Sequence, residues 1–256
     1  MRLLLDLGNT RIKWLLLDDQ DQPVTDGAAA WSEQLDDDLG RPWLALPLPT
    51  RIWAASVVDG EREARLERLT RECFRLKPDW LRTPAAACGI TNGYSQPGRL
   101  GIDRFLAMIA ARADYPGPTV IASIGTALAL DAIDADGRHL GGLIAPGPRL
   151  MQQSVLGATV QVRLQQQGHL VPVATNTEDG LMSGAWQACI ALIERFHGQI
   201  ERQLGTSVQL RLAGGDAAPL PAWLSLPSVL RVDSVLQGLA IWSASLEATA
   251  AEAAVS

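Results

Sequence analysis

The feature that most constrains the fold of this chain is a short pattern that occurs twice. Residues 3–10 read LLLDLGNT and residues 120–127 read VIASIGTA. In each segment an apolar run is followed by a short polar residue, one apolar residue and a glycine. A threonine then stands one or two positions after the glycine. The two glycines, Gly8 and Gly125, stand about half the chain apart. This spacing suggests an internal duplication, in which each half opens with a strand, a glycine turn and a second strand.

The first of these turns has two interpretations. Gly8-Asn9 is favourable chemistry for a β-hairpin, because glycine and, less often, asparagine adopt positive φ. The turn can also form a phosphate cradle of exposed backbone N–H groups. In that case the Thr10 hydroxyl and the Lys13 ammonium join the N–H groups, and Asp6 holds Mg²⁺ through water. Taken alone, the pattern favours the hairpin, so the rest of the chain must decide.

The composition excludes several classes of function. The 256 residues are 47% hydrophobic and 20% charged, which fits one large globular domain or two of ordinary size. A net charge of −6 and a pI of about 5.1 argue against nucleic-acid binding, which relies on concentrated Lys and Arg. No run reaches the roughly 18 apolar residues of a membrane span. The three cysteines lack the spacing of a disulfide framework or a zinc site. We therefore expect a cytoplasmic protein without nucleic-acid or membrane partners.

Strand and helix periodicities alternate along the chain, which predicts a mixed α/β fold. Strands are expected at 51–58, 119–125, 127–133, 141–147 and 208–213, and helices at 61–76, 100–113, 185–204 and from 235 onward. Prolines and a glycine at 115–118 interrupt this pattern. We therefore expect two domains, residues 1–115 and 116–256, whose glycine turns face each other across a cleft.

Several motifs together resemble the type III pantothenate kinases, a family of the acetate and sugar kinase, Hsp70 and actin superfamily. They extend over nearly the whole chain: DLGNTRIK at 6–13, NGY at 92–94, GIDR at 101–104, SIGTALALD at 123–131, HLGGLIAPG at 139–147, NTEDGLMSG at 176–184 and AGGD at 213–216. The resemblance implies two related ribonuclease-H-like (actin-like) α/β domains with a nucleotide cleft between them. It also implies that a homodimer phosphorylates pantothenate to 4'-phosphopantothenate with ATP and Mg²⁺, the first step of coenzyme A biosynthesis.

The resemblance also implies roles for individual residues. Those around the ATP phosphates are Gly8, Asn9, Thr10, Lys13, Gly125 and Thr126, with Asp6 near Mg²⁺ and Gly214, Gly215 and Asp216 on the adenosine side. Those of the pantothenate pocket are Tyr94, Gly101, Ile102, Asp103, Arg104 and Thr177. Asp103 matches the catalytic base, whose carboxylate orients the substrate hydroxyl and accepts its proton. Arg104 can bind the substrate carboxylate through a bidentate pair.

Taken singly, the same residues have ordinary structural explanations. Asp103 suits a helix N-terminus, where the dipole favours a carboxylate. Arg104 suits a surface salt bridge, and Tyr94 a half-buried position in a turn. The Gly-Gly-Asp sequence at 214–216 is, by itself, more often a plain turn. Only the order and spacing of all the motifs favour the kinase interpretation.

The second glycine loop departs from the family pattern at two positions. Ser123 stands where the family has an aspartate that resembles a ligand of a monovalent cation, K⁺ or NH₄⁺, and Ala129 stands where it has a threonine. Both changes remove oxygen ligands or charge, and cation affinity depends on ligand charge as well as geometry. The requirement for a monovalent cation is therefore open, with Asp131 as an alternative ligand.

Three hypotheses follow for the function. The chain is a working pantothenate kinase with a weakened or replaced cation site, or a catalytically degenerate relative with a regulatory or accessory role. It can also be another small-molecule kinase or phosphatase of the same superfamily, although the NGY and GIDR motifs point to pantothenate. The retained functional residues favour the working kinase: Asp6, Lys13, Asp103, Arg104 and Thr126.

Overall fold

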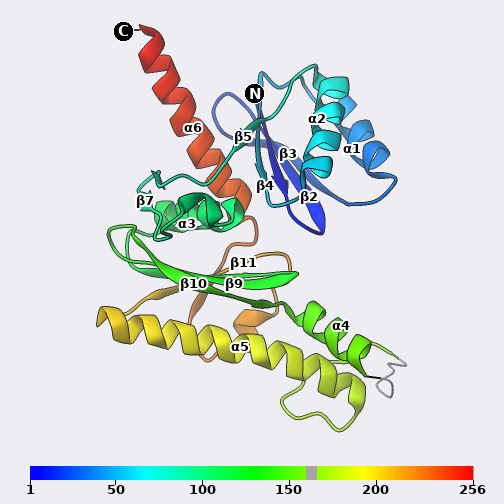
Figure 1. Ribbon diagram of the computed structural model, residues 1–256, viewed down its shortest axis with the longest axis vertical. Coiled ribbons are helices and arrows are strands. Elements are labelled where there is room, and N and C mark those ends of the chain that lie inside the picture. Colours follow the sequence, from blue (N-terminus) through cyan, green and yellow to red (C-terminus); the bar gives the residue numbers. More distant parts are fainter. Residues whose placement is uncertain (160–165, 256) are drawn as a thin grey trace. The chain divides into compact units, whose positions relative to one another are not determined.

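The computed structural model describes residues 1–159 and 166–255, and its contacts divide the chain into two units (Figure 1). Unit 1 comprises Met1–Ala113 and Ser234–Ser256, and unit 2 comprises Asp114–Asp233. Each unit contains a five-stranded sheet. No helix among the described residues combines the length and the apolar character that crossing a membrane requires.

The sheet of unit 1 has the strand order β3-β2-β1-β4-β5. Its strands are β1 (Arg2–Leu7), β2 (Arg11–Leu17), β3 (Pro23–Ala30), β4 (Arg51–Ser56) and β5 (Asp79–Leu81). Strand β2 runs antiparallel to β1 and β3, whereas β4 runs parallel to β1 and β5. Alternate apolar residues of the first hairpin lie on one face and pack against α1 (Leu35–Leu44) and α2 (Gly60–Phe74). This alternation is why the opening segment forms strands.

The C-terminal helix α6 (Ser234–Val255) belongs to unit 1 and packs against β1, β2 and β4. Figure 1 shows it on the side of the sheet away from α1 and α2. The Arg2 guanidinium donates to the Ser243 hydroxyl at 3.2 Å, and the Trp53 indole donates to Glu247 at 2.8 Å. The expected 116–256 domain therefore differs from the structure at its C-terminal end. The first sheet has two apolar faces, and this helix covers the second.

The connection from β5 leads through two short strands, β6 (Ala86–Ala87) and β7 (Ile90–Thr91), and the 3-10 turn η1 (Pro97–Arg99) to helix α3 (Ile102–Asp114). Helix α3 crosses α6 closely, because a Cβ atom at Gly238 would lie 2.0 Å from the Leu106 carbonyl oxygen. The Phe105 and Trp242 rings meet edge to face, with centroids 5.8 Å apart. Helix α3 and the loop before it are thereby fixed to unit 1.

The sheet of unit 2 repeats the topology of the first, with the strand order β10-β9-β8-β11-β12. Its strands are β8 (Thr119–Ile124), β9 (Ala127–Ile133), β10 (His139–Pro146), β11 (Gln209–Ala213) and β12 (Ser228–Leu230). Strand β9 is antiparallel to β8 and β10, and β11 is parallel to β8 and β12. The duplicated sequence pattern thus corresponds to a duplicated sheet.

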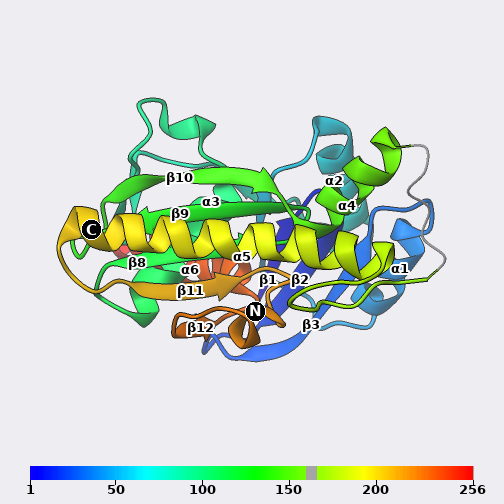
Figure 2. The ribbon, with the colours of Figure 1, turned by 90° about the horizontal axis from the view of Figure 1, so that it is seen from below.

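Helix α5 (Thr177–Leu204) covers one face of the second sheet (Figure 2). It is preceded by α4 (Pro148–Ala158), and the turn η2 (Leu220–Ala222) lies between β11 and β12. The sequence predicted that the long helix starts at 185, but it starts at Thr177. Asn176 caps it by accepting a hydrogen bond from the Asp179 N–H at 2.8 Å. Gly180 and Gly184 lie inside the first turns, and their low helix propensity concealed this start.

Candidate functional site

The first glycine turn joins β1 to β2 as a hairpin. The Gly8 N–H donates to the Arg11 carbonyl at 3.1 Å, and a Cβ atom at Gly8 would lie 3.3 Å from the same oxygen. The Trp31 indole donates to the Gly8 carbonyl at 2.7 Å, which holds the turn from the side. Asn9 and Thr10 are exposed at the tip. The hairpin and the phosphate cradle are therefore compatible interpretations of one turn.

Asp6 and Lys13 are cross-strand partners beside this turn. Directly opposed residues of an antiparallel pair share one face and have neighbouring Cβ atoms. Both side chains are half-buried, and their face is the one away from the core formed with α1 and α2. The turn therefore carries a carboxylate and an ammonium at neighbouring positions of one face.

Tyr94 and Arg104 form the centre of the predicted substrate pocket. Arg104 Nη1 donates to the Tyr94 hydroxyl at 3.1 Å, and the guanidinium carbon lies 5.8 Å from the centroid of the Tyr94 ring. Only 6% of Arg104 is exposed, so a solvated surface salt bridge does not describe it. A buried arginine held by a tyrosine is suited to binding an anionic group of a small molecule.

Asn92 fixes the loop that carries Tyr94. Its amide nitrogen donates to the carbonyls of Pro84 at 3.2 Å and Pro97 at 3.1 Å, and its amide oxygen accepts from the Tyr94 N–H at 2.9 Å. Sequence reasoning placed Asn92 in the NGY motif but gave it no role. The three bonds depend on loop segments that only folding brings together.

Asp103 lies in the first turn of α3 and folds back toward Gly101. A Cβ atom built on Gly101 would lie 2.5 Å from Asp103 Oδ1, so the absence of a side chain there makes room for the carboxylate. The Gly101 carbonyl accepts the Phe105 N–H at 3.1 Å, which begins the helix. Ile102 is buried beneath. The structure thus brings Tyr94 and the whole GIDR motif into unit 1.

The second glycine turn joins β8 to β9 and is one residue shorter than the first. The Gly125 N–H donates to the Ala127 carbonyl at 3.0 Å, and Thr126 is exposed. The start of α4 packs directly on this turn, because the Gly147 N–H donates to the Thr126 carbonyl at 2.9 Å. A Cβ atom at Gly147 would lie 1.9 Å from the Gly125 carbonyl oxygen. Gly147 is therefore a required glycine that the motif comparison left without a role.

The Gly-Gly-Asp segment packs on the same corner of unit 2. Gly214 has φ of +92°, and a Cβ atom there would lie 2.2 Å from the Ile124 carbonyl oxygen. The Asp216 N–H donates to that oxygen at 3.2 Å. Arg149 Nη2, in the first turn of α4, lies 2.9 Å from Asp216 Oδ1. Gly215 is exposed beside this pair. The two predicted nucleotide segments of unit 2 therefore meet at the end of β8.

The position expected for a monovalent cation is poorly equipped with ligands. Ser123 is the cross-strand partner of Ala129 on β9 and of Ala213 on β11, so the adjoining side chains contain no oxygen. Asp131 is buried and 2.9 Å from His139 Nε2, which commits its carboxylate to a structural pair. Within residues 1–159 and 166–255, no group of three His, Cys, Asp or Glu residues could hold a metal ion. Ser123 and its two cross-strand partners therefore offer a cation one hydroxyl and no carboxylate.

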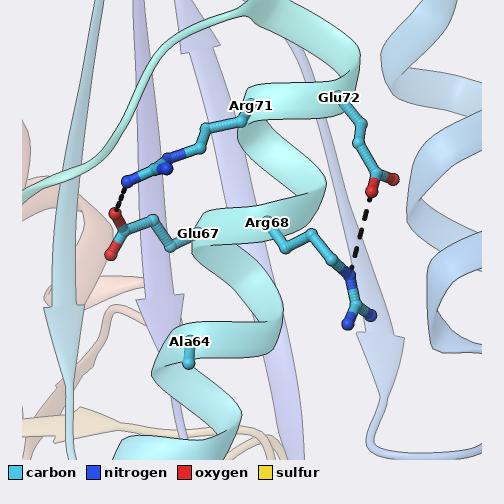
Figure 3. A pocket seen from close by; sticks show the side chains of 5 residues that line it. All are labelled: Ala64, Glu67, Arg68, Arg71 and Glu72. Carbon is cyan, nitrogen blue, oxygen red and sulfur yellow. Dashed lines mark hydrogen bonds and ion pairs between the residues drawn. The ribbon is translucent and has the colours of Figure 1, made fainter.

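Two further features are Thr177 and a surface hollow on α2. Thr177 is the exposed first residue of α5 in unit 2, whereas Asp103 belongs to unit 1. A surface hollow on α2 is lined by Ala64, Glu67, Arg68, Arg71 and Glu72 (Figure 3). Its side chains form the ion pairs Arg71–Glu67 and Arg68–Glu72 along the helix. The hollow is therefore a solvated charged face, as the alternating charges predicted.

Two sheets of identical topology, each beginning with a strand–glycine turn–strand, define a two-domain actin-like protein. The solved structures that share this fold include the following two. A Campylobacter jejuni protein assigned to the Baf family of transcriptional activators is 19% identical, with a TM-score of 0.61 over 96% of this chain and 98% of that one. The activator of 2-hydroxyisocaproyl-CoA dehydratase from Clostridium difficile is 11% identical, with a TM-score of 0.54 over 100% and 98%. Likeness at such low identity defines the fold alone.

Sequence comparison identifies the family. The sequence model of the type III pantothenate kinases matches residues 2–199. The type III pantothenate kinase of Burkholderia thailandensis is 37% identical over 254 residues, which span 93% of this chain and 96% of that protein. The chain belongs to the type III pantothenate kinase family.

Proposed function

We propose that this protein transfers the γ-phosphoryl group of ATP to the primary hydroxyl of pantothenate and forms 4'-phosphopantothenate. The observation that carries the proposal is the cluster of Tyr94, Asp103 and Arg104, built on α3 and the loop before it. The Asp103 carboxylate can orient the pantothenate hydroxyl. The buried Arg104 guanidinium can bind the pantothenate carboxylate. Membership of the family supports the same substrate.

In this reaction, Asp103 orients the acceptor hydroxyl and receives its proton as the oxygen–phosphorus bond forms. A general base of this kind contributes typically about 10² to 10⁴-fold in rate. Arg104 binds the pantothenate carboxylate, and the Tyr94 hydroxyl and ring hold its guanidinium in place. Because Arg104 is buried, this ion pair forms away from bulk water, where it is stronger than on the surface.

Each glycine turn supplies groups that bind phosphate. Backbone N–H groups and the hydroxyls of Thr10 and Thr126 face phosphate oxygens, and Lys13 adds a positive charge. Asp6 beside Lys13 is the residue that would hold Mg²⁺ through water. When bound, that ion neutralises charge on the phosphates. The single hydroxyl of Ser123 supports a kinase that works without a monovalent cation at that position.

We further propose that the protein is a cytoplasmic homodimer. Four apolar side chains of unit 2 are exposed on the edge strand β10 and on α4: Leu143 (43%), Ile144 (66%), Leu150 (40%) and Val155 (41%). Strand β10 contacts α4, so these exposed apolar side chains belong to two neighbouring elements. Apolar side chains gathered at a folded surface favour association with a partner, and these two elements carry four of the exposed ones. The three cysteines are free thiols, which suits a reducing compartment.

The test is a coupled ADP-release assay with purified protein, MgATP and pantothenate, run separately in sodium and potassium buffers. Hexoses, glycerol and acetate serve as alternative acceptors. Turnover that depends on pantothenate and is equal in both buffers is the expected result. Turnover with a sugar, or ATP binding without turnover of any acceptor by folded protein, would contradict the proposed reaction.

A further inference from the structure

Arg149 and Asp216 form an ion pair that the motif comparison did not suggest. They are far apart in the sequence, yet Arg149 Nη2 lies 2.9 Å from Asp216 Oδ1. The Asp216 side chain is largely buried, at 14% exposure, whereas that of Arg149 is 72% exposed. Asp216 therefore holds one edge of a guanidinium whose remaining surface faces solvent.

The location of the pair links it to the second glycine turn. Arg149 lies two residues after Gly147, whose N–H donates to the Thr126 carbonyl at 2.9 Å. Asp216 lies two residues after Gly214, and the Asp216 N–H donates to the Ile124 carbonyl at 3.2 Å. Both ends of the ion pair are thus attached to the corner that includes Gly125 and Thr126. The guanidinium is confined to the neighbourhood of that turn.

A contribution to folding stability explains the pair poorly. Because the Arg149 side chain is 72% exposed, solvent screens the ion pair, which therefore adds little to the stability of the protein. Arg149 also stands in the first turn of α4, a helix without an acidic residue in that turn, where the helix dipole disfavours a cation. The largely buried Asp216 carboxylate nevertheless holds the Arg149 guanidinium at this helix end. An anion that binds beside the guanidinium explains this arrangement better.

We propose that Arg149 is a nucleotide-binding residue, whose guanidinium contacts the phosphate chain of a nucleoside triphosphate bound at Gly125–Thr126. Asp216 is its positioning residue and holds the guanidinium toward the turn. An arginine suits this role because its planar fork can donate two parallel hydrogen bonds to a phosphate. The inference rests on the proposed function for the identity of the ligand, and it extends the nucleotide site to α4.

The test measures nucleotide affinity directly, by isothermal titration calorimetry of the full chain with MgATP in the absence of pantothenate. The variants are Arg149→Gln, which keeps the length of the side chain but removes its charge, and Asp216→Asn. Arg138→Gln is the matched control, because Arg138 is an exposed arginine of the same unit beyond the other end of β9. Steady-state KM values for ATP and pantothenate complete the comparison.

We expect Arg149→Gln to weaken MgATP binding at least about tenfold and to reduce its dependence on ionic strength. Its melting temperature and its KM for pantothenate should stay near the parent values. Asp216→Asn should weaken binding less, because the guanidinium remains present but less well oriented. The Arg138→Gln control should match the parent in every measurement.

Unchanged MgATP affinity in Arg149→Gln would overturn the inference, as would an equal loss in Arg138→Gln. A parent protein that does not bind MgATP would also overturn it. The proposed reaction fails separately: MgATP binding that depends on Arg149, without turnover of pantothenate, would leave the inference standing and refute the reaction.

Discussion

Replacing Gly101 by alanine should displace Asp103, the proposed catalytic base, without unfolding the protein. The added Cβ atom would lie 2.5 Å from Asp103 Oδ1, whereas ordinary contact begins near 3.4 Å. The carboxylate must therefore move by roughly 1 Å or rotate away, and a misplacement of this size costs about 10²-fold in rate. Because the colliding atom is the far end of a flexible side chain, the cost to stability should be small.

The assay for Gly101→Ala is steady-state turnover of pantothenate, with thermal unfolding measured in parallel. We expect kcat to fall about 10²-fold, with the KM for ATP within about twofold of the parent. Gly98→Ala is the matched control in the same loop, since a Cβ atom there would meet nothing within 4 Å. A Gly101→Ala variant with the parent kcat would refute the reasoning.

A double variant separates the proposed cause from an indirect one. If Gly101→Ala acts only by displacing the Asp103 carboxylate, then adding it to Asp103→Asn should cost little further rate, because the base is already removed. A double variant that loses the full product of both effects would mean that Gly101 acts through another contact, such as with the substrate itself.

The remaining predictions concern the base, the cation position, a buried thiol and the dimer. Asp103→Asn should lower kcat about 10² to 10⁴-fold with the fold intact, and near-parent turnover would exclude Asp103 as the base. Ser123→Asp should introduce dependence on K⁺ or NH₄⁺, and an unchanged salt profile would count against the loss of a cation ligand at this position. Burial raises the pKa of Cys189 to about 11, so its thiol stays protonated at pH 8 and should alkylate far more slowly in the folded than in the unfolded protein, as peptide mass mapping can measure. Ile144→Glu should reduce the molar mass in light scattering to that of one chain; an unchanged dimer would place the interface elsewhere.

Much of the fold follows from local sequence patterns. The hairpins β1–β2 and β8–β9 are set by alternating apolar residues and a glycine turn, and helix α2 by the helical spacing of its apolar residues. These patterns act between near neighbours in the chain, so sequence reasoning recovered them. The GIDR motif is local in the same way, since the proposed base Asp103 and Arg104 are adjacent at the start of α3.

The sequence by itself determined the duplicated α/β architecture and predicted, through its motifs, which residues carry the chemistry, because a motif and its period are properties of neighbouring residues. Only the tertiary structure decided that α6 covers the second face of the first sheet, that Asp131 pairs with His139, and that Arg149 reaches Asp216. The contacts of α6 and the Arg149–Asp216 pair join segments distant in the chain, and the Asp131–His139 pair depends on the register of β9 with β10. Each depends on how elements pack together, and neither propensity nor motif spacing specifies that packing.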